Sequence, residues 1–347
     1  MFLSVNQKSI LLATAIALGS AGFAQAQSNT QEVAIEFEGW VGEDRFVCGE
    51  SYDRVGRAET TITPTDFRFY VSDVALIDED GNPVPVELEQ DGKWQHQSTA
   101  LLDFEDGSNA CDNGTTETNT AIVGTVPEGD YQGLQFTLGV PQNLNHEDAA
   151  IAPSPLNLTS MWWNWQGGYK FLRAEMETDS AIANAVSQPS HSHGGNHSTT
   201  KPSSQTGLFK NEPSDRPQAG NAQMEHGGMN HDMSHGNGDK TNASSNSYLI
   251  HLGSTGCKES ARSPLFGCAN PNRATVTLSD FNPDDNVVIA DLAELLFETD
   301  LGTNQANTPT GCMSSPEDSD CSGIIQRLGL SFNGMTAPEG QQFFFVE

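Results

Sequence analysis

The chain has 347 residues, of which 36% are hydrophobic, so there is enough apolar material for a folded core. Its 46 Asp and Glu residues against 16 Lys and Arg residues give a formal net charge of −30. A surface this acidic repels phosphate backbones and anionic lipid headgroups, which argues against a nucleic-acid or membrane-surface partner. Metal cations and basic proteins remain open as partners.

The N-terminus has the features of a secretory signal peptide at residues 1–26. Lys8 precedes an apolar run over residues 10–21, and the small-residue site Ala24-Gln25-Ala26 follows it. That run is too short to span a bilayer, and no later stretch is long or apolar enough to do so. We therefore expect an exported protein, periplasmic or secreted to the outer surface, with no transmembrane segment.

From Val33 onward, short alternating runs rich in β-branched and aromatic residues are separated by clusters of Gly, Pro, Asn and Asp. This pattern predicts an all-β fold, a single disulfide-stapled antiparallel β-sandwich-like domain with a few short helices. The expected strands are Val33–Trp40, Phe67–Leu76, Ala121–Thr125, Leu134–Leu138, Tyr169–Met176, Tyr248–Leu252, Ala274–Leu278 and Gln341–Val346. Helices are expected at Val288–Glu298 and, as a single turn, at Gly323–Leu328.

Residues 179–247 interrupt the strand pattern with Ser, Gly, Asn, Pro and His, and with hardly any aromatic side chain. Such a composition does not bury enough apolar surface to order itself, so we expect a disordered His- and Met-rich insertion. The strand pattern resumes cleanly behind it. The folded domain is therefore expected to comprise residues 27–178 and 248–347.

Export favours disulfides among the six cysteines, which allow fifteen pairings. Cys257 with Cys268, and Cys312 with Cys321, would each close a short loop. This leaves Cys48 to pair with Cys111. A catalytic thiol is disfavoured because none of the six lies in a Cys-x-x-Cys or other nucleophile setting.

The insertion holds six of the nine histidines, and methionines are interleaved with the last three. Imidazole nitrogen and thioether sulfur together suit copper, above all Cu(I), so we expect copper ligands among His226, Met229, His231, Met233 and His235. A Gly-hinged chain can wrap an ion without a preformed cavity. The alternative is a solvated linker whose histidines are accidental.

The folded part holds three further histidines, His96, His146 and His251. A single histidine on a strand or loop is more often a hydrogen-bonded structural group than a ligand, and for His251 both readings remain open. His96 follows Trp94 at a spacing of two, which on an extended chain places both side chains on one face. No Ser-His-Asp order with a nucleophile elbow, phosphate-binding glycine loop or nucleotide fingerprint is present, so a hydrolase or nucleotide enzyme is disfavoured.

Three of the five tryptophans, Trp162, Trp163 and Trp165, crowd into four positions. Core packing or a carbohydrate platform would explain them, and tryptophan chains can also pass oxidising equivalents.

Several motifs together resemble one family, the MbnP proteins, also described as metallo-mystery-pair four-Cys proteins. The motifs are Cys48-Gly49, Arg68-Phe69-Tyr70-Val71-Ser72-Asp73-Val74, Leu101-Leu102-Asp103-Phe104-Glu105, Leu138-Gly139-Val140-Pro141, Asn145-His146, the run from Trp163 to Phe171, His251-Leu252-Gly253-Ser254-Thr255-Gly256-Cys257 and Gly311-Cys312-Met313. They span the expected mature domain apart from the insertion. The insertion and the six cysteines depart from the compact family pattern.

The resemblance implies a copper-binding protein, not an enzyme, that works beside MbnH, a di-haem partner of the cytochrome c peroxidase family. In that family the partner oxidises a tryptophan to kynurenine, on which copper binding depends. The related surface copper proteins CorA and MopE use kynurenine with histidines, and MopE presents them as Trp-x-His. Here this pattern falls on Trp94-Gln95-His96, which makes Trp94 the expected kynurenine and His96 a ligand. His146 is expected as the second imidazole, with His251 in reserve.

Two other functions compete with copper uptake or storage. One is a copper-dependent oxidase with a three-histidine centre of His96, His146 and His251. The other is a structural β-sandwich whose His-rich loop merely buffers metal.

Overall fold

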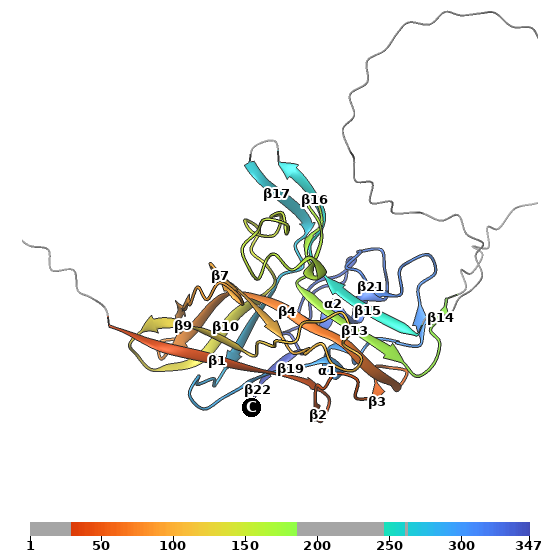
Figure 1. Cartoon of the computed structure of the whole chain (residues 1–347), viewed down its shortest axis with the longest axis horizontal. Coiled ribbons are helices and arrows are strands. Elements are labelled where there is room, and N and C mark those ends of the chain that lie inside the picture. Colours follow the sequence, from red (N-terminus) through yellow and green to blue (C-terminus); the bar gives the residue numbers. More distant parts are fainter. Residues whose placement is uncertain (1–28, 186–245, 261–262) are drawn as a thin grey trace, which may run out of the picture.

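The structure is a computed structural model that describes residues 29–185, 246–260 and 263–347 (Figure 1). The expected signal peptide and the expected copper ligands His226, Met229, His231, Met233 and His235 lie outside these residues. Neither α-helix in the described chain has the length and apolar character needed to cross a bilayer.

One sheet of the described chain is built around the N-terminal strand. It contains β1 (Thr30–Val41), β2 (Asp44–Arg45), β6 (Glu87–Leu88), β9 (Ala121–Pro127), β19 (Val288–Asp291) and β22 (Phe344–Val346). Val33, Ile35 and Phe37 of β1 alternate with exposed residues, because successive side chains of a strand point to opposite faces. The strand predicted from Val33 to Trp40 is thereby confirmed.

The second and larger sheet is organised around the long central strand β4 (Thr60–Asp78). Its other strands are β3 (Tyr52–Val55), β5 (Pro83–Pro85), β7 (Gln95–His96), β8 (Thr99–Asp103), β10 (Tyr131–Leu138), β13 (Leu172–Thr178), β15 (Ser247–Leu252), β18 (Ala274–Ser279) and β21 (Gly311–Cys312). Antiparallel pairing dominates as predicted, but β1 with β19 and β15 with β21 run parallel.

Three small two-stranded sheets complete the described fold. They pair β11 (Trp162–Asn164) with β12 (Gly168–Tyr169), β14 (Ala183–Asn184) with β20 (Thr303–Asn304), and β16 (Thr255–Ser260) with β17 (Ser263–Asn270). The β16–β17 hairpin projects away from the two large sheets (Figure 1). Strand β14 lies at the start of the range expected as insertion, and Ile182 just before it is buried in the core.

The helices are short, as expected, but one prediction of their extent is wrong. Residues Val288–Asp291, predicted as the start of a helix, form the buried strand β19 beside β1, and α1 covers only Leu292–Leu296. The β-branched pair Val288 and Ile289 fits a strand in a buried sheet. The Asp291 side chain then caps α1 by accepting hydrogen bonds from the backbone N–H groups of Ala293 and Glu294. The other helical elements are α2 (Cys321–Arg327), close to the predicted turn, and η1 (Thr159–Met161).

The main core lies between the two large sheets. Phe37 of β1 packs edge-on against Phe69 of β4 and Phe136 of β10, with ring centroids 6.3 and 5.7 Å apart. These T-shaped contacts tie the faces of the two sheets together, which is the sandwich arrangement that the sequence predicts.

A second apolar cluster lies apart from the main core, beneath the loops that lead to β11 and β12. It comprises Tyr70, Leu101, Val140, Leu144, Ala149, Leu156, Met161, Tyr169 and Phe171, with Trp94 and Trp162 packed against it. Tyr70 and Tyr169 meet edge-on at 5.9 Å, and their hydroxyls donate to the carbonyls of Pro155 and Leu156. The cluster gives the loops above it a rigid base.

All three predicted disulfides are present: Cys48–Cys111, Cys257–Cys268 and Cys312–Cys321. The first and third are buried, whereas Cys257 and Cys268 are partly exposed on the projecting hairpin.

Candidate functional site

His251 belongs to a network of buried charges within the larger sheet. Its Nε2 lies 2.6 Å from Oε1 of Glu175, and because a carboxylate only accepts, the ring donates Nε2–H. Glu175 also accepts from Nε of Arg173 at 2.7 Å. Burial lowers the pKa of His251, so the ring is neutral at pH 7. One nitrogen of His251 is therefore committed to Glu175.

The network continues through Asp66 to Arg68, a fully buried guanidinium. Arg68 pairs with Asp66 and lies 3.3 Å from Glu105, while Arg173 Nε lies 3.1 Å from Asp66. Burial raises the pKa of Glu175, but hydrogen bonds from His251 and Arg173 outweigh it and bring that pKa to about 2. His251 thus sits among groups that hold one another in place, which is the structural reading that the sequence left open.

Trp94 and His96 lie at the start of the β7–β8 hairpin. Oδ1 of Asp91 accepts from the backbone N–H groups of Lys93 and Trp94, both at 2.8 Å, which fixes the approach to β7. Trp94 is partly buried against the second apolar cluster, with Nζ of Lys93 4.7 Å from its ring centroid. Nε2 of His96 lies 3.2 Å from the side-chain amide of Gln97.

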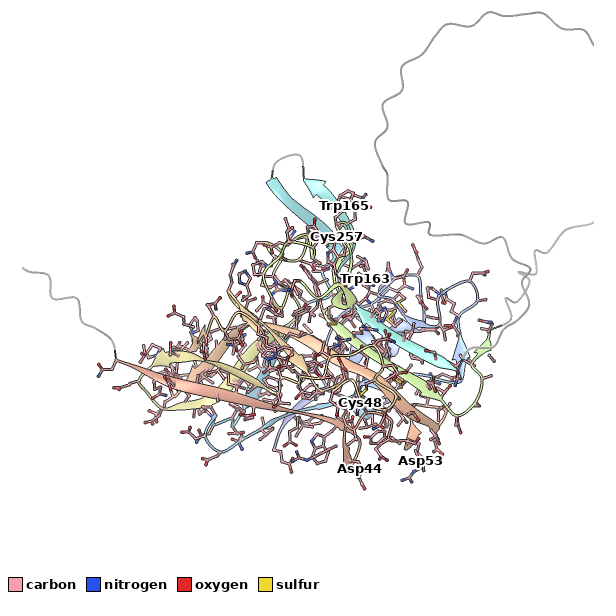
Figure 2. The ribbon with its side chains drawn as sticks, in the orientation of Figure 1. Asp44, Cys48, Asp53, Trp163, Trp165 and Cys257 are labelled. Carbon is pink, nitrogen blue, oxygen red and sulfur yellow. A yellow bond between two sulfur atoms is a disulfide. The ribbon has the colours of Figure 1, made fainter. Side chains whose placement is uncertain are left out.

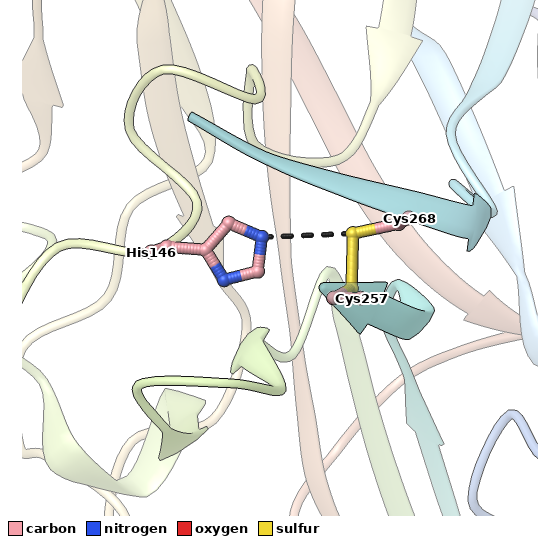
Figure 3. Close-up of side chains that lie close together, drawn as sticks. All are labelled: His146, Cys257 and Cys268. Atoms are coloured by element: carbon pink, nitrogen blue, oxygen red, sulfur yellow. Dashed lines mark hydrogen bonds between the residues drawn. A yellow bond between two sulfur atoms is a disulfide. The ribbon is translucent and has the colours of Figure 1, made fainter. Parts of the chain in front are cut away.

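His146 lies in the loop after β10, against the β11–β12 hairpin. Its Nδ1 is 3.2 Å from the carbonyl oxygen of Trp165, so this nitrogen carries the proton and donates. The Nε2 atom then holds the ring lone pair. It accepts from Nδ2 of Asn145 at 3.4 Å and lies 3.6 Å from Sγ of Cys268 (Figure 3). Burial lowers the pKa of His146, so the ring is neutral at pH 7 and can serve as a metal ligand.

Asn145 clamps the hairpin in this position. It is 1% exposed, and its Oδ1 accepts from the backbone N–H of Tyr169 at 2.9 Å. A Cβ at Gly168, where φ is +74°, would lie only 2.4 Å from the carbonyl oxygen of Asn145. The pair Asn145-His146 and the dipeptide Gly168-Tyr169 are therefore one structural unit, which is why they occur together in the sequence motif.

The turn of the hairpin presents tryptophans at the surface. Oδ1 of Asn164 accepts from the backbone N–H groups of Gln166 and Gly167, closing a turn that leaves Trp165 53% exposed. Trp163 packs over Gly253, where a Cβ would meet its ring at 2.6 Å. Figure 2 shows Trp165 farther than Trp163 from the body of the two large sheets.

A shallow cavity of about 380 Å³ opens beside this hairpin. Trp163, Cys257 and Met313 are among its lining residues. The imidazole of His146 and the thioether of Met313 are both donors of the kind that copper accepts. Met313 lines this cavity, whereas His146 is not among its lining residues.

The structure does not gather the three predicted histidines into one centre. Among the described residues, the group of three potential ligands whose donor atoms all lie within 4.8 Å of one another is His146, Cys257 and Cys268. Neither His96 nor His251 belongs to it. Sequence reasoning named His146 but missed its neighbours from the β16–β17 hairpin, because the contact joins residues 122 positions apart.

These features define a disulfide-bonded β-sandwich protein with a tryptophan hairpin held against a histidine. The family model for MbnP matches residues 30–219, and the chain belongs to the MbnP family. Among solved structures, MbnP from Methylosinus trichosporium is similar, with a TM-score of 0.66, 26% sequence identity, and coverage of 92% of this chain and 98% of that chain. No curated protein matches the chain.

Proposed function

We propose that this protein is an exported copper-binding protein for copper uptake or storage. Its folded site is completed when an MbnH-like di-haem partner oxidises a tryptophan to kynurenine. Membership of the MbnP family and the neutral imidazole of His146 beside a tryptophan hairpin support this proposal. The charge of −30 favours docking to a partner with a basic surface.

The chemistry explains why the modification matters. An indole nitrogen gives its lone pair to the ring and offers only an N–H donor, so it is no ligand. Two molecules of hydrogen peroxide each deliver one oxygen atom and leave as water, which breaks the C2–C3 bond and opens the pyrrole ring to N-formylkynurenine. Hydrolysis then removes the formyl group as formate and leaves an aryl amine. That nitrogen, together with imidazoles, makes a low-coordinate site that tolerates Cu(I).

Two places in the fold present a tryptophan for this reaction. The Trp-x-His spacing favours Trp94 with His96, on the β7–β8 hairpin. The geometry adds Trp163 and Trp165, because the backbone of their hairpin is hydrogen-bonded to His146 and one of its rings is half exposed. This contact between His146 and Trp165 is the observation that carries the proposal, and it favours the hairpin over Trp94.

Peptide mass spectrometry of protein produced with its partner tests the proposal and separates the two places. Trypsin leaves Trp94 and the hairpin in one peptide, because there is no Lys or Arg between Lys93 and Lys170. Cleavage after glutamate separates them, because Glu105 and Glu147 lie between. We expect the mass change of kynurenine in one of the two peptides, and copper at the folded site only in modified protein.

Matched variants show which tryptophan is oxidised. Trp163→Phe and Trp165→Phe remove the candidates on the hairpin, and Trp94→Phe removes the other. Protein with all three disulfides intact that binds copper tightly at His146 while every tryptophan is unmodified would refute the kynurenine step. Copper binding unaffected by His146→Gln would refute the site itself.

The His- and Met-rich segment adds a separate expectation, because His226, Met229, His231, Met233 and His235 offer further soft donors. In a variant lacking residues 186–245, one tight copper site should survive. Loss of all tight binding would favour the structural sandwich with a buffering loop.

The copper-oxidase alternative needs His96, His146 and His251 around one ion. Among the described residues, neither His96 nor His251 joins His146 in a group of donor atoms close enough to share an ion, which speaks against it. Turnover of dioxygen or peroxide by the isolated copper-loaded protein would favour the oxidase.

A further inference from the structure

The Cys257–Cys268 bond differs from the other two disulfides in its surroundings. Cys312, Cys321 and Cys111 are fully buried and Cys48 is 4% exposed, whereas both sulfurs of Cys257–Cys268 belong to partly exposed residues. A dissolved thiol therefore reaches this bond without unfolding the sandwich.

Breaking this bond leaves the strand pairing of the two large sheets unaltered. Strands β16 and β17 pair with each other and with no strand of the two large sheets. Cys257 and Cys268 are direct cross-strand partners in their register, flanked by Thr255 with Asn270 and Lys258 with Gly267. Backbone pairing thus keeps the two sulfurs adjacent on the same face of the hairpin.

The third member of the group is already oriented toward these sulfurs. Donation from Nδ1 of His146 to the carbonyl of Trp165 fixes the ring and aims the lone pair of Nε2 at Sγ of Cys268, 3.6 Å away (Figure 3). A hydrogen bond from the other ring nitrogen to a backbone carbonyl is the arrangement that supports metal-bound histidines.

We propose that Cys257, Cys268 and His146 form a second metal site, for Cu(I), once the disulfide has been reduced. The donor atoms of the three residues all lie within 4.8 Å of one another. A metal ion with ligand bonds of about 2.0–2.3 Å to nitrogen and sulfur spans such a group. Two thiolates and an imidazole make a soft set that selects Cu(I), whereas the intact disulfide offers only weakly donating sulfurs.

The step balances with a dithiol as reductant. The S–S bond takes up two electrons and two protons and becomes two thiols, while the dithiol loses the same electrons and protons and closes its own disulfide. Binding of Cu(I) then displaces the two thiol protons into solvent. No oxidised tryptophan takes part, so this site is independent of the kynurenine step, although His146 belongs to both.

The test uses the full chain produced without a haem partner, so that its tryptophans stay unmodified. Under anaerobic conditions a limited amount of dithiol is added and removed. Cu(I) is then supplied as its acetonitrile complex, and accessible thiols are alkylated and mapped by peptide mass spectrometry. Alkylation is specific to cysteine, and residues 186–245 contain no cysteine, so copper bound to their histidines and methionines does not affect the readout.

We expect Cys257 and Cys268 to be reduced before the other four cysteines, with circular dichroism unchanged. Cu(I) should then slow their alkylation by at least about tenfold, and His146→Gln should remove most of that protection. Asn143→Ala, a change to an exposed residue on the same loop and outside the group, is the control. Simultaneous reduction of all three disulfides, alkylation unaffected by Cu(I), or equal protection in the His146→Gln protein would each overturn the proposal.

Discussion

His146 and His251 stand in contrasting surroundings, although both are neutral imidazoles in motifs of the same family. His251 is enclosed by Glu175 and by the charges around Arg68, whereas His146 lies on a loop between the tryptophan hairpin and a partly exposed disulfide. Each ring donates one N–H, His251 to a buried carboxylate within the sheet and His146 to a loop carbonyl. What differs is the neighbourhood, because only Nε2 of His146 faces the two sulfurs of a disulfide. The surroundings of a motif histidine therefore decide with which other donors it can share an ion.

The largest effect should come from breaking the network around His251. In the Arg68→Met protein, Asp66 and Glu105 keep buried charges without their main partner, which should lower the free energy of unfolding by roughly 3–5 kcal/mol. Urea denaturation followed by tryptophan fluorescence measures it.

Arg45→Met is the matched control, since Arg45 pairs with Glu38 while its side chain is 67% exposed. Such a surface pair should contribute only about 0–1 kcal/mol. Similar losses in the two variants would show that the buried network does not stabilise the fold.

Asp103, the buried cross-strand partner of Arg68, should give the same network a distinct pH dependence. Burial is the main cause that raises the pKa of Asp103 from 3.8 to about 8. The folded protein therefore holds a proton there that the unfolded chain releases, so stability falls as pH rises from about 4 to about 8. Residue 103 no longer titrates in the Asp103→Asn protein. Between pH 5 and pH 8, wild type should therefore lose on the order of 2 kcal/mol of unfolding free energy that the variant keeps. Urea midpoints at the two pH values measure this loss, and a constant difference between the two proteins would contradict the raised pKa.

More of the sandwich fold than of the candidate site could be predicted from the sequence. Alternation at Val33, Ile35 and Phe37 reports which face of β1 is buried, because that periodicity is local. The β-strand at Val288–Asp291 was missed because its pairing with β1, some 250 positions earlier, decides between helix and strand. The contact of His146 with Cys268 has no local signal either, since it depends on where the β16–β17 hairpin folds back.

Exchanging each histidine for glutamine tests the comparison directly. In the His251→Gln protein a flexible amide replaces the fixed imidazole donor to a buried carboxylate, which should cost about 1–3 kcal/mol of stability, with copper still bound at the folded site. His146→Gln should change stability by less, because the loop keeps its Asn145 clamp, but should abolish tight copper binding there. Parallel urea and copper-competition titrations give both quantities. Copper loss in the His251→Gln protein alone would reverse the assignment.

The smallest expected effect on stability is that of Trp165→Phe. The side chain is 53% exposed, and it is the backbone carbonyl of residue 165, unaltered by the exchange, that holds His146. The free energy of unfolding should therefore change by no more than about 0.5 kcal/mol. Because phenylalanine cannot yield kynurenine, this variant separates support of His146 from supply of the oxidised ring. If the partner still oxidises the Trp165→Phe protein fully and that protein binds copper, the reacting indole is another tryptophan. If an equally stable protein is neither oxidised nor able to bind copper, the reacting indole is that of Trp165.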